Sequence, residues 1–142
     1  MKKNLKIYFV QTDLSWQDKK ANLLKLDNLI SPLMNADIIL LPEMFNTAFC
    51  PKSTHLAETM DEDTVNWMIK ISKKKKCAIV GTLMIKEEDK IFNRLVWISR
   101  SGDIYTYDKR HLFSLIGEQR YISPGSKRLI IEENGWKICP LI

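Results

Sequence analysis

The chain has 142 residues, of which 45% are hydrophobic and 27% charged, with a formal net charge of +5. This length and composition predict one globular domain and exclude a disordered or low-complexity protein. The positive charge does not indicate a nucleic-acid-binding protein. Its one dense run, residues 73–76, follows a helical apolar pattern and has no interleaved aromatic residues, so it is typical of a solvated helix end, with a phosphate-binding patch as the alternative.

The N-terminal residues do not form a signal peptide or a membrane span. The apolar stretch Ile7 to Val10 is short and is followed by polar residues, so we expect a cytoplasmic protein. The three cysteines, Cys50, Cys77 and Cys139, are an odd number at wide spacing without a C-x-x-C pair. This pattern favours reduced thiols over a disulfide framework or a zinc site. The sequence has no Gly-rich phosphate loop and no His/Cys cluster with metal-ligand spacing, so we expect no metal and no cofactor.

The first half of the chain alternates between strand and helix patterns. We predict a short strand over 6–11, a helix over 18–34 and a continuous apolar strand over 37–41. A second helix is expected to be capped by Asp61 or Asp63 and to run to about Lys75.

The second half of the chain predicts a meander of strands. Three strands are expected over 77–85, 92–99 and 103–107, joined by polar or glycine-containing turns. A last pair, 129–132 and 136–142, surrounds Asn134-Gly135, a strong hairpin dipeptide. The whole pattern indicates one α/β unit, with two strand-helix pairs followed by antiparallel strands.

Two charged residues directly follow predicted strands. Glu43 comes after the strand over 37–41, and Lys109 comes after the strand over 103–107. Functional groups in open α/β sheets gather beyond the carboxyl ends of the strands, where burial can raise the pKa of a carboxylate toward that of a useful general base. Taken alone, each residue is more simply explained as a solvated surface charge.

Several short motifs together resemble the carbon-nitrogen hydrolase, or nitrilase, superfamily. Each motif is weak alone, and their occurrence in the family's order gives the resemblance its weight. They are the opening segment 10–16 with Asp18, Lys19 and Asn22, the glutamate motif Leu41-Pro42-Glu43-Met44-Phe45, the pair Phe92-Asn93, the lysine motif 107–113, and Gly117-Glu118 followed by Tyr121 and 123–125.

This resemblance implies a fold and a set of catalytic residues. The fold would be an α-β-β-α sandwich, with residues 1–142 forming the N-terminal half of a single domain that is incomplete at its C-terminal end. Glu43 would be the general base, Lys109 the cation that stabilises the oxyanion, and Glu118 a second carboxylate that orients the site.

The resemblance also implies a nucleophilic cysteine, expected just after Ile142 and outside this chain. Cys139 is rejected as a substitute, because it lies within the predicted last strand and is better explained as a buried thiol. Either the polypeptide ends at Ile142, or it continues through a residue at position 143 that is chemically altered or is not a standard amino acid. We favour the second, since a low-pKa active-site cysteine is easily oxidised or modified.

Within the superfamily, the lysine motif and Gly117-Glu118 look most like the omega-amidase branch. That branch hydrolyses 2-oxoglutaramate and 2-oxosuccinamate to keto acids and ammonia. Phe49, Phe113 and Arg110 are candidate substrate-binding residues, with ordinary packing or surface roles as alternatives. His111 could support Lys109 or Glu43 through a hydrogen bond, or be structural.

The resemblance implies a small-molecule amide substrate and a homodimer or higher homo-oligomer. The charge distribution and the lack of a helix with a membrane-binding pattern favour no nucleic-acid or membrane partner. Two alternatives stay open. One is a nitrilase-like amidase or carbamoylase of other specificity. The other is a non-catalytic truncated relative that acts through protein contacts.

Overall fold

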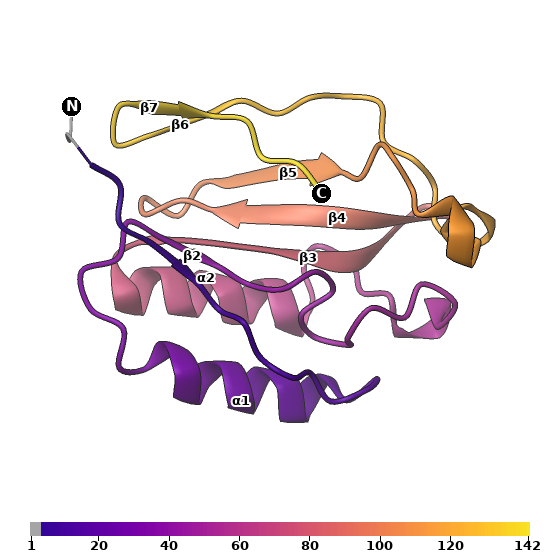
Figure 1. Cartoon of the computed structure of the whole chain (residues 1–142), viewed down its shortest axis with the longest axis horizontal. Helices are drawn as coiled ribbons and strands as arrows, with labels where there is room; N and C mark the ends of the chain where they lie inside the picture. The colour runs from indigo at the N-terminus through magenta and orange to yellow at the C-terminus, as the bar shows by residue number, and fades with distance from the viewer. Residues whose placement is uncertain (1–3) are drawn as a thin grey trace.

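The computed structural model describes residues 4–142 and contains a five-stranded mixed sheet (Figure 1). The strand order follows the chain: β1 (Ile7–Phe9), β2 (Ile38–Leu40), β3 (Ala78–Glu87), β4 (Lys90–Ile98) and β5 (Ile104–Asp108). β1, β2 and β3 pair in parallel, whereas β3, β4 and β5 pair antiparallel. The predicted strand-helix pairs followed by a meander are therefore confirmed.

Two helices, α1 (Lys19–Ile30) and α2 (Asp63–Lys75), cover one face of the sheet (Figure 1). Their inner residues, such as Leu26 and Met68, pack with Ile39 and Ile79 of the sheet in one buried cluster. α1 ends four residues before the predicted limit, because Pro32 lacks the N–H group that would continue the helical hydrogen bonds. Over residues 4–142, neither helix has the length and apolar character that crossing a bilayer requires.

The prediction that Asp61 or Asp63 caps α2 was wrong. Asp63 is the first helical residue, and Asp61 instead accepts a hydrogen bond from the Thr59 hydroxyl. The carboxylate of Glu58, which is 3% exposed, accepts hydrogen bonds from the Thr64 backbone N–H at 3.1 Å and from its hydroxyl at 2.9 Å. A buried glutamate from the preceding segment therefore accepts a hydrogen bond from one of the free backbone N–H groups at the start of α2.

The opposite face of the sheet carries a hairpin made of β6 (Ile131–Glu133) and β7 (Trp136–Ile138) (Figure 1). Asn134 and Gly135 form its turn with φ values of 53° and 82°, the left-handed conformation that the dipeptide predicts. Ile131 packs into a cluster with Trp97 and Tyr107 of the sheet.

The last predicted strand is too long. β7 ends at Ile138, and Pro140 lacks the N–H group needed to extend the ladder. Cys139 consequently lies after the strand and is exposed, so the prediction of a buried strand thiol at this position was wrong. Residues 4–142 also contain three short 3-10 helices, η1 (Thr54–Leu56), η2 (Ser114–Ile116) and η3 (Glu118–Arg120).

Candidate active site

Glu43 lies in a loop that follows β2 and rests against β3. The backbone N–H of Met44, whose φ is +46°, donates to the Thr82 hydroxyl at 2.8 Å, and the N–H of Phe45 donates to the Thr82 carbonyl at 3.3 Å. A Cβ atom added to Gly81 would lie 2.6 Å from the Phe45 ring. The loop therefore needs both a hydroxyl and a glycine on β3 to hold Glu43 in place.

Lys109 directly follows β5 and is fixed through its backbone. Its N–H donates to the Asn93 carbonyl at 2.9 Å, and its carbonyl accepts from the Gly125 N–H at 2.8 Å. The preceding residue, Asp108, accepts two hydrogen bonds from the Arg94 guanidinium, at 2.6 and 3.0 Å. A charge-assisted bidentate pair of this kind holds the end of β5 at a defined position.

Glu118 is the first residue of η3 and is completely buried. Gly117 precedes it with a φ of +75°, a conformation in which glycine carries no steric penalty. The backbone N–H of Phe113 donates to Glu118 Oε2 at 2.6 Å. This hydrogen bond joins the two ends of the loop over 113–118 and holds the Glu118 carboxylate in the protein interior.

These three residues meet at the ammonium group of Lys109. Its Nζ lies 2.8 Å from Glu43 Oε1 and 3.1 Å from Glu118 Oε2. The Glu43 side chain is 37% exposed, whereas those of Lys109 and Glu118 are 8% and 0% exposed. One carboxylate is thus a fixed internal counter-ion, and the other can be reached from outside.

The surroundings of Lys109 keep it protonated. Burial alone would lower its pKa, but the hydrogen bonds and negative charges of Glu43 and Glu118 outweigh burial and raise the pKa above the usual lysine value. The group is therefore a positively charged hydrogen-bond donor at neutral pH. Such a donor can stabilise an oxyanion.

Asn93, on β4, is a site residue that sequence reasoning included only as part of a family motif. It is 1% exposed, and its Nδ2 donates to Glu43 Oε1 at 2.7 Å and to Glu118 Oε1 at 3.3 Å. The signal in the sequence is an uncharged polar residue near the start of the predicted strand over 92–99. A side chain of this kind is costly to bury unless a partner is available.

The three candidate substrate-binding residues differ in their positions. The Phe49 ring lies 5.2 Å from Lys109 Nζ, in cation-π range. Phe113 reaches the site through its backbone N–H, and its side chain is 46% exposed. Arg110 is half-buried and His111 is exposed, and within residues 4–142 neither forms a hydrogen bond or ion pair with Glu43 or Lys109.

None of the three cysteines is bonded to this site in the described residues. Cys50 and Cys77 are buried, and Cys139 is exposed. Burial raises the pKa of the Cys77 thiol to about 11, so it is uncharged and unreactive at neutral pH. The prediction of a buried thiol at the start of a strand is confirmed for Cys77.

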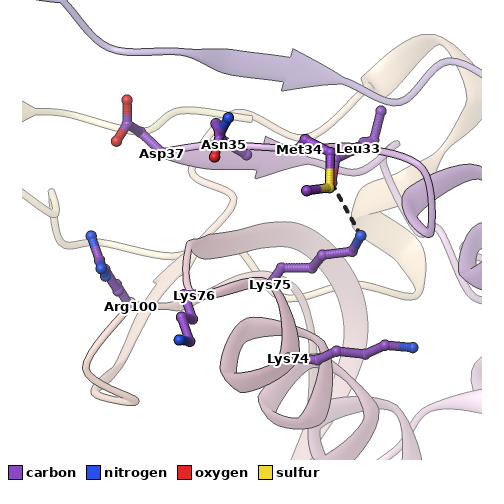
Figure 2. A pocket seen from close by; sticks show the side chains of 9 residues that line it. Leu33, Met34, Asn35, Asp37, Lys74, Lys75, Lys76 and Arg100 are labelled. Atoms are coloured by element: carbon purple, nitrogen blue, oxygen red, sulfur yellow. Dashed lines mark hydrogen bonds between the residues drawn. The ribbon is translucent and has the colours of Figure 1, made fainter.

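A separate basic pocket of about 420 Å³ lies at the other end of the sheet, beside Asp37 and the end of α2 (Figure 2). Lys75 Nζ donates to the carbonyl oxygens of Ser31 at 2.6 Å and Leu33 at 3.1 Å. In Figure 2 the side chains of Lys74 and Lys75 both extend to the right, but their ammonium groups end apart from one another and do not converge on one point. The lysine run is therefore the end of α2, as the sequence predicted.

The sequence matches the family model described as carbon-nitrogen hydrolase over residues 6–142. The chain belongs to the carbon-nitrogen hydrolase family. A structure of a family member from Xanthomonas campestris, with an arsenic adduct in its active site, superposes with a TM-score of 0.93 at 36% identity and covers 96% of this chain and 52% of that one. The expected nitrilase-like α/β fold is thus confirmed over about half the length of such structures.

Curated proteins with related sequences include two amidases. The omega-amidase YafV of Escherichia coli is 35% identical over 138 residues, which are 97% of this chain and 54% of that protein. The 2-oxoglutaramate amidase of Bacillus subtilis is 31% identical over 139 residues, which are 94% of this chain and 53% of that protein. The chain therefore spans about half the length of the curated relatives it matches.

Proposed function

We propose that the complete protein hydrolyses a linear amide through a cysteine thioester and releases ammonia. The observation that carries this proposal is the placement of Lys109 Nζ between Glu43, which is accessible, and Glu118, which is fully buried. A buried cation with one fixed and one reachable carboxylate is suited to stabilise an oxyanion next to a general base. A protein that acts only through surface contacts has no need for this arrangement.

The proposed reaction has two halves that use the same residues. In the first, Glu43 takes the thiol proton as the cysteine sulfur attacks the amide carbon, and Lys109 stabilises the resulting oxyanion. The C–N bond then breaks as the nitrogen takes the proton from Glu43. Ammonia departs, and the acyl group remains bound to the cysteine as a thioester. In the second, Glu43 takes a proton from water, which attacks the thioester carbon. The C–S bond then breaks, the sulfur takes the proton back from Glu43, and the carboxylic acid product leaves.

The nucleophile in this proposal is a cysteine that follows Ile142, so that residues 1–142 form the first half of one domain. Two observations support this. None of Cys50, Cys77 and Cys139 bonds to the site in the described residues, and the chain spans about half the length of its curated relatives.

The proposed substrates are 2-oxoglutaramate and 2-oxosuccinamate. The names of the relatives, omega-amidase and 2-oxoglutaramate amidase, support this choice. Both molecules carry a carboxylate next to the ketone, which a cation could hold. Arg110 is the candidate for that role, and Phe49, whose ring lies near Lys109 Nζ, is the candidate wall beside the amide.

The test is ammonia release by the complete protein from a panel of amides. The panel contains 2-oxoglutaramate, 2-oxosuccinamate, glutamine, asparagine, a simple aliphatic amide and an N-carbamoyl amino acid. We expect the two keto-acid amides to have the highest kcat/KM. Preference for another amide would overturn the proposed substrate, and absence of ammonia from every compound would overturn the proposed hydrolysis.

A further inference from the structure

Asn93 connects all the charged groups of the candidate site from a single position on β4. Its Nδ2 donates to Glu43 Oε1 at 2.7 Å and to Glu118 Oε1 at 3.3 Å, and its backbone carbonyl accepts from the N–H of Lys109 at 2.9 Å. The side chain is 1% exposed and lies in the central antiparallel part of the sheet, opposite Met84. Its position is therefore set by the sheet and not by a loop.

Chemistry fixes which end of the Asn93 amide faces the carboxylates. Rotating the amide by half a turn would place Oδ1 against two carboxylate oxygens, which cannot donate when ionised. The NH₂ group must therefore point at Glu43 and Glu118. In the described residues Oδ1 is buried without a hydrogen-bond partner. This orientation therefore costs the desolvation free energy of one carbonyl oxygen, which the two hydrogen bonds donated by Nδ2 offset.

Both hydrogen bonds that Glu43 accepts from the described residues end on the same oxygen. Oε1 receives Asn93 Nδ2 at 2.7 Å and Lys109 Nζ at 2.8 Å, whereas Oε2 receives none. Two donors on one oxygen fix the rotation of the carboxylate. Because both hydrogen bonds occupy Oε1, this oxygen is poorly placed to accept a proton from the thiol or from water. Oε2 is then the oxygen that remains able to bind a proton.

We infer that Asn93 is a positioning residue that selects Oε2 of Glu43 as the proton acceptor. This inference rests on the proposed amide hydrolysis, because it concerns the base of that reaction. Without the amide, only Lys109 would hold Oε1, and the carboxylate could rotate between its two oxygens. Asn93 thus acts through Glu43 and does not itself contact the reacting atoms.

The inference predicts a specific effect on pH dependence. Within residues 4–142, Glu43 pairs with the charged group of Lys109, after β5, and Lys109 in turn contacts Glu118, in η3. A hydrogen bond donated to a carboxylate favours its ionised form, so removal of the Asn93 donor makes the carboxylate bind its proton more readily. The acid limb of the kcat/KM profile should then move to higher pH.

The experiment compares Asn93→Leu with the wild type in the complete protein. Leucine has nearly the same shape but no donor, and we expect kcat to fall by about ten- to a hundredfold with little change in KM. The acid limb of the kcat/KM profile should move to higher pH. A fall in kcat with an unmoved acid limb would mean that Asn93 is merely structural and would overturn the inference.

A second variant covers the case in which Asn93→Leu does not fold. Asn93→Asp keeps the size of the side chain and replaces the donor by a third carboxylate, which repels Glu43 and Glu118 when ionised. We expect turnover to be lost at neutral pH and partly regained as the pH falls, because a protonated carboxyl can again donate. Turnover equal to wild type across the pH range would contradict the inference.

Ser72→Ala is the matched control for lost buried hydrogen bonds. Ser72 is completely buried on α2, and its hydroxyl lies 2.9 Å from the carbonyl oxygens of Cys77 and Ser99, away from the site. This variant should lower the melting temperature without moving the acid limb. If it moves the limb as far as Asn93→Leu does, the shift reflects general loosening and the inference fails.

A readout without turnover separates this inference from the proposed function. The ¹³C chemical shift of the Glu43 carboxyl carbon can be followed against pH in the wild type and in Asn93→Leu, with Glu43→Gln used to assign the signal. An upward shift of the titration midpoint supports the inference even if no amide is hydrolysed. An unchanged midpoint overturns it, whether or not the wild type releases ammonia.

Discussion

Lys109 Nζ lies 2.8 Å from Glu43 Oε1 although the two residues are 66 positions apart in the sequence. The same ammonium group lies 3.1 Å from Glu118, whose carboxylate is fully buried. One end of the sheet thus brings together residues from the loop after β2, the loop after β5 and η3. Breaking a buried charged contact of this kind leaves an uncompensated charge, so each member should be sensitive to substitution.

Lys109→Ala should lower turnover by at least about 100- to 1000-fold, because it removes the cation proposed to stabilise the oxyanion. It should also lower the melting temperature, since Glu118 is left buried with one partner fewer. Ammonia release and thermal unfolding measure the two effects. Lys127→Ala, at an exposed lysine, is the control and should change neither. Near-normal turnover of Lys109→Ala would remove this residue from the mechanism.

Glu43→Gln should abolish most turnover while leaving the fold intact. The glutamine Oε1 can still accept hydrogen bonds from Lys109 and Asn93, but the side chain no longer takes a proton. We expect kcat to fall by about 100- to 10,000-fold. The control Glu132→Gln, at an exposed glutamate on β6, should behave as wild type. Retained activity in Glu43→Gln would mean that another group is the base.

Gly125→Ala should destabilise the protein and reduce turnover. A Cβ atom at this position would overlap the carbonyl oxygen of Asp108, and the Gly125 N–H also holds the carbonyl of Lys109. We expect a loss of about 1–3 kcal/mol in the free energy of unfolding, as for other overpacked positions. Urea unfolding and ammonia release would measure this.

Gly102→Ala provides the comparison for Gly125→Ala. Gly102 has a φ of +97° and nothing within 4 Å of an added Cβ, so alanine there introduces only backbone strain, about 1–2 kcal/mol. Its kcat should equal that of the wild type. If both glycine variants lose turnover equally, the loss follows from instability and not from displacement of Lys109.

Glu133→Gln should make the protein more stable at neutral pH. Burial raises the pKa of Glu133, with the charge of Asp37 adding to the increase, so the folded state holds the proton more tightly than the unfolded state does. The resulting stability is present at acid pH and is lost as the pH rises through the raised pKa. The melting temperature of Glu133→Gln should therefore exceed that of the wild type near pH 8, and the difference should shrink toward pH 4. A difference in melting temperature between the two proteins that does not vary with pH would contradict the raised pKa of Glu133.

The sequence predicted the order and type of the main elements, because their patterns are local. The continuous apolar strand over β2 and the helical periodicity of α1 and α2 depend on neighbouring residues only. The ends of elements were less predictable. The cap of α2 comes from Glu58, a tertiary contact that a search of adjacent residues would not reveal.

The candidate site was predicted through charged residues at strand ends and through family motifs. The role of Asn93 could not be derived in this way, since its importance comes from the side chains that β2, β5 and η3 bring to it. The bidentate pair between Arg94 and Asp108 joins facing residues of β4 and β5. It can therefore be recognised only once the register of these two strands is known. Burial of Glu118 likewise depends on the closed loop from Phe113.

The most direct test of the proposed hydrolysis is to trap the thioester. The complete protein is mixed with 2-oxoglutaramate, quenched in acid within the first turnover and mapped by peptide mass spectrometry. We predict an acyl adduct on a cysteine that follows Ile142, absent in Glu43→Gln. Ammonia release without any adduct, or an adduct on Cys50, Cys77 or Cys139, would contradict the proposed mechanism.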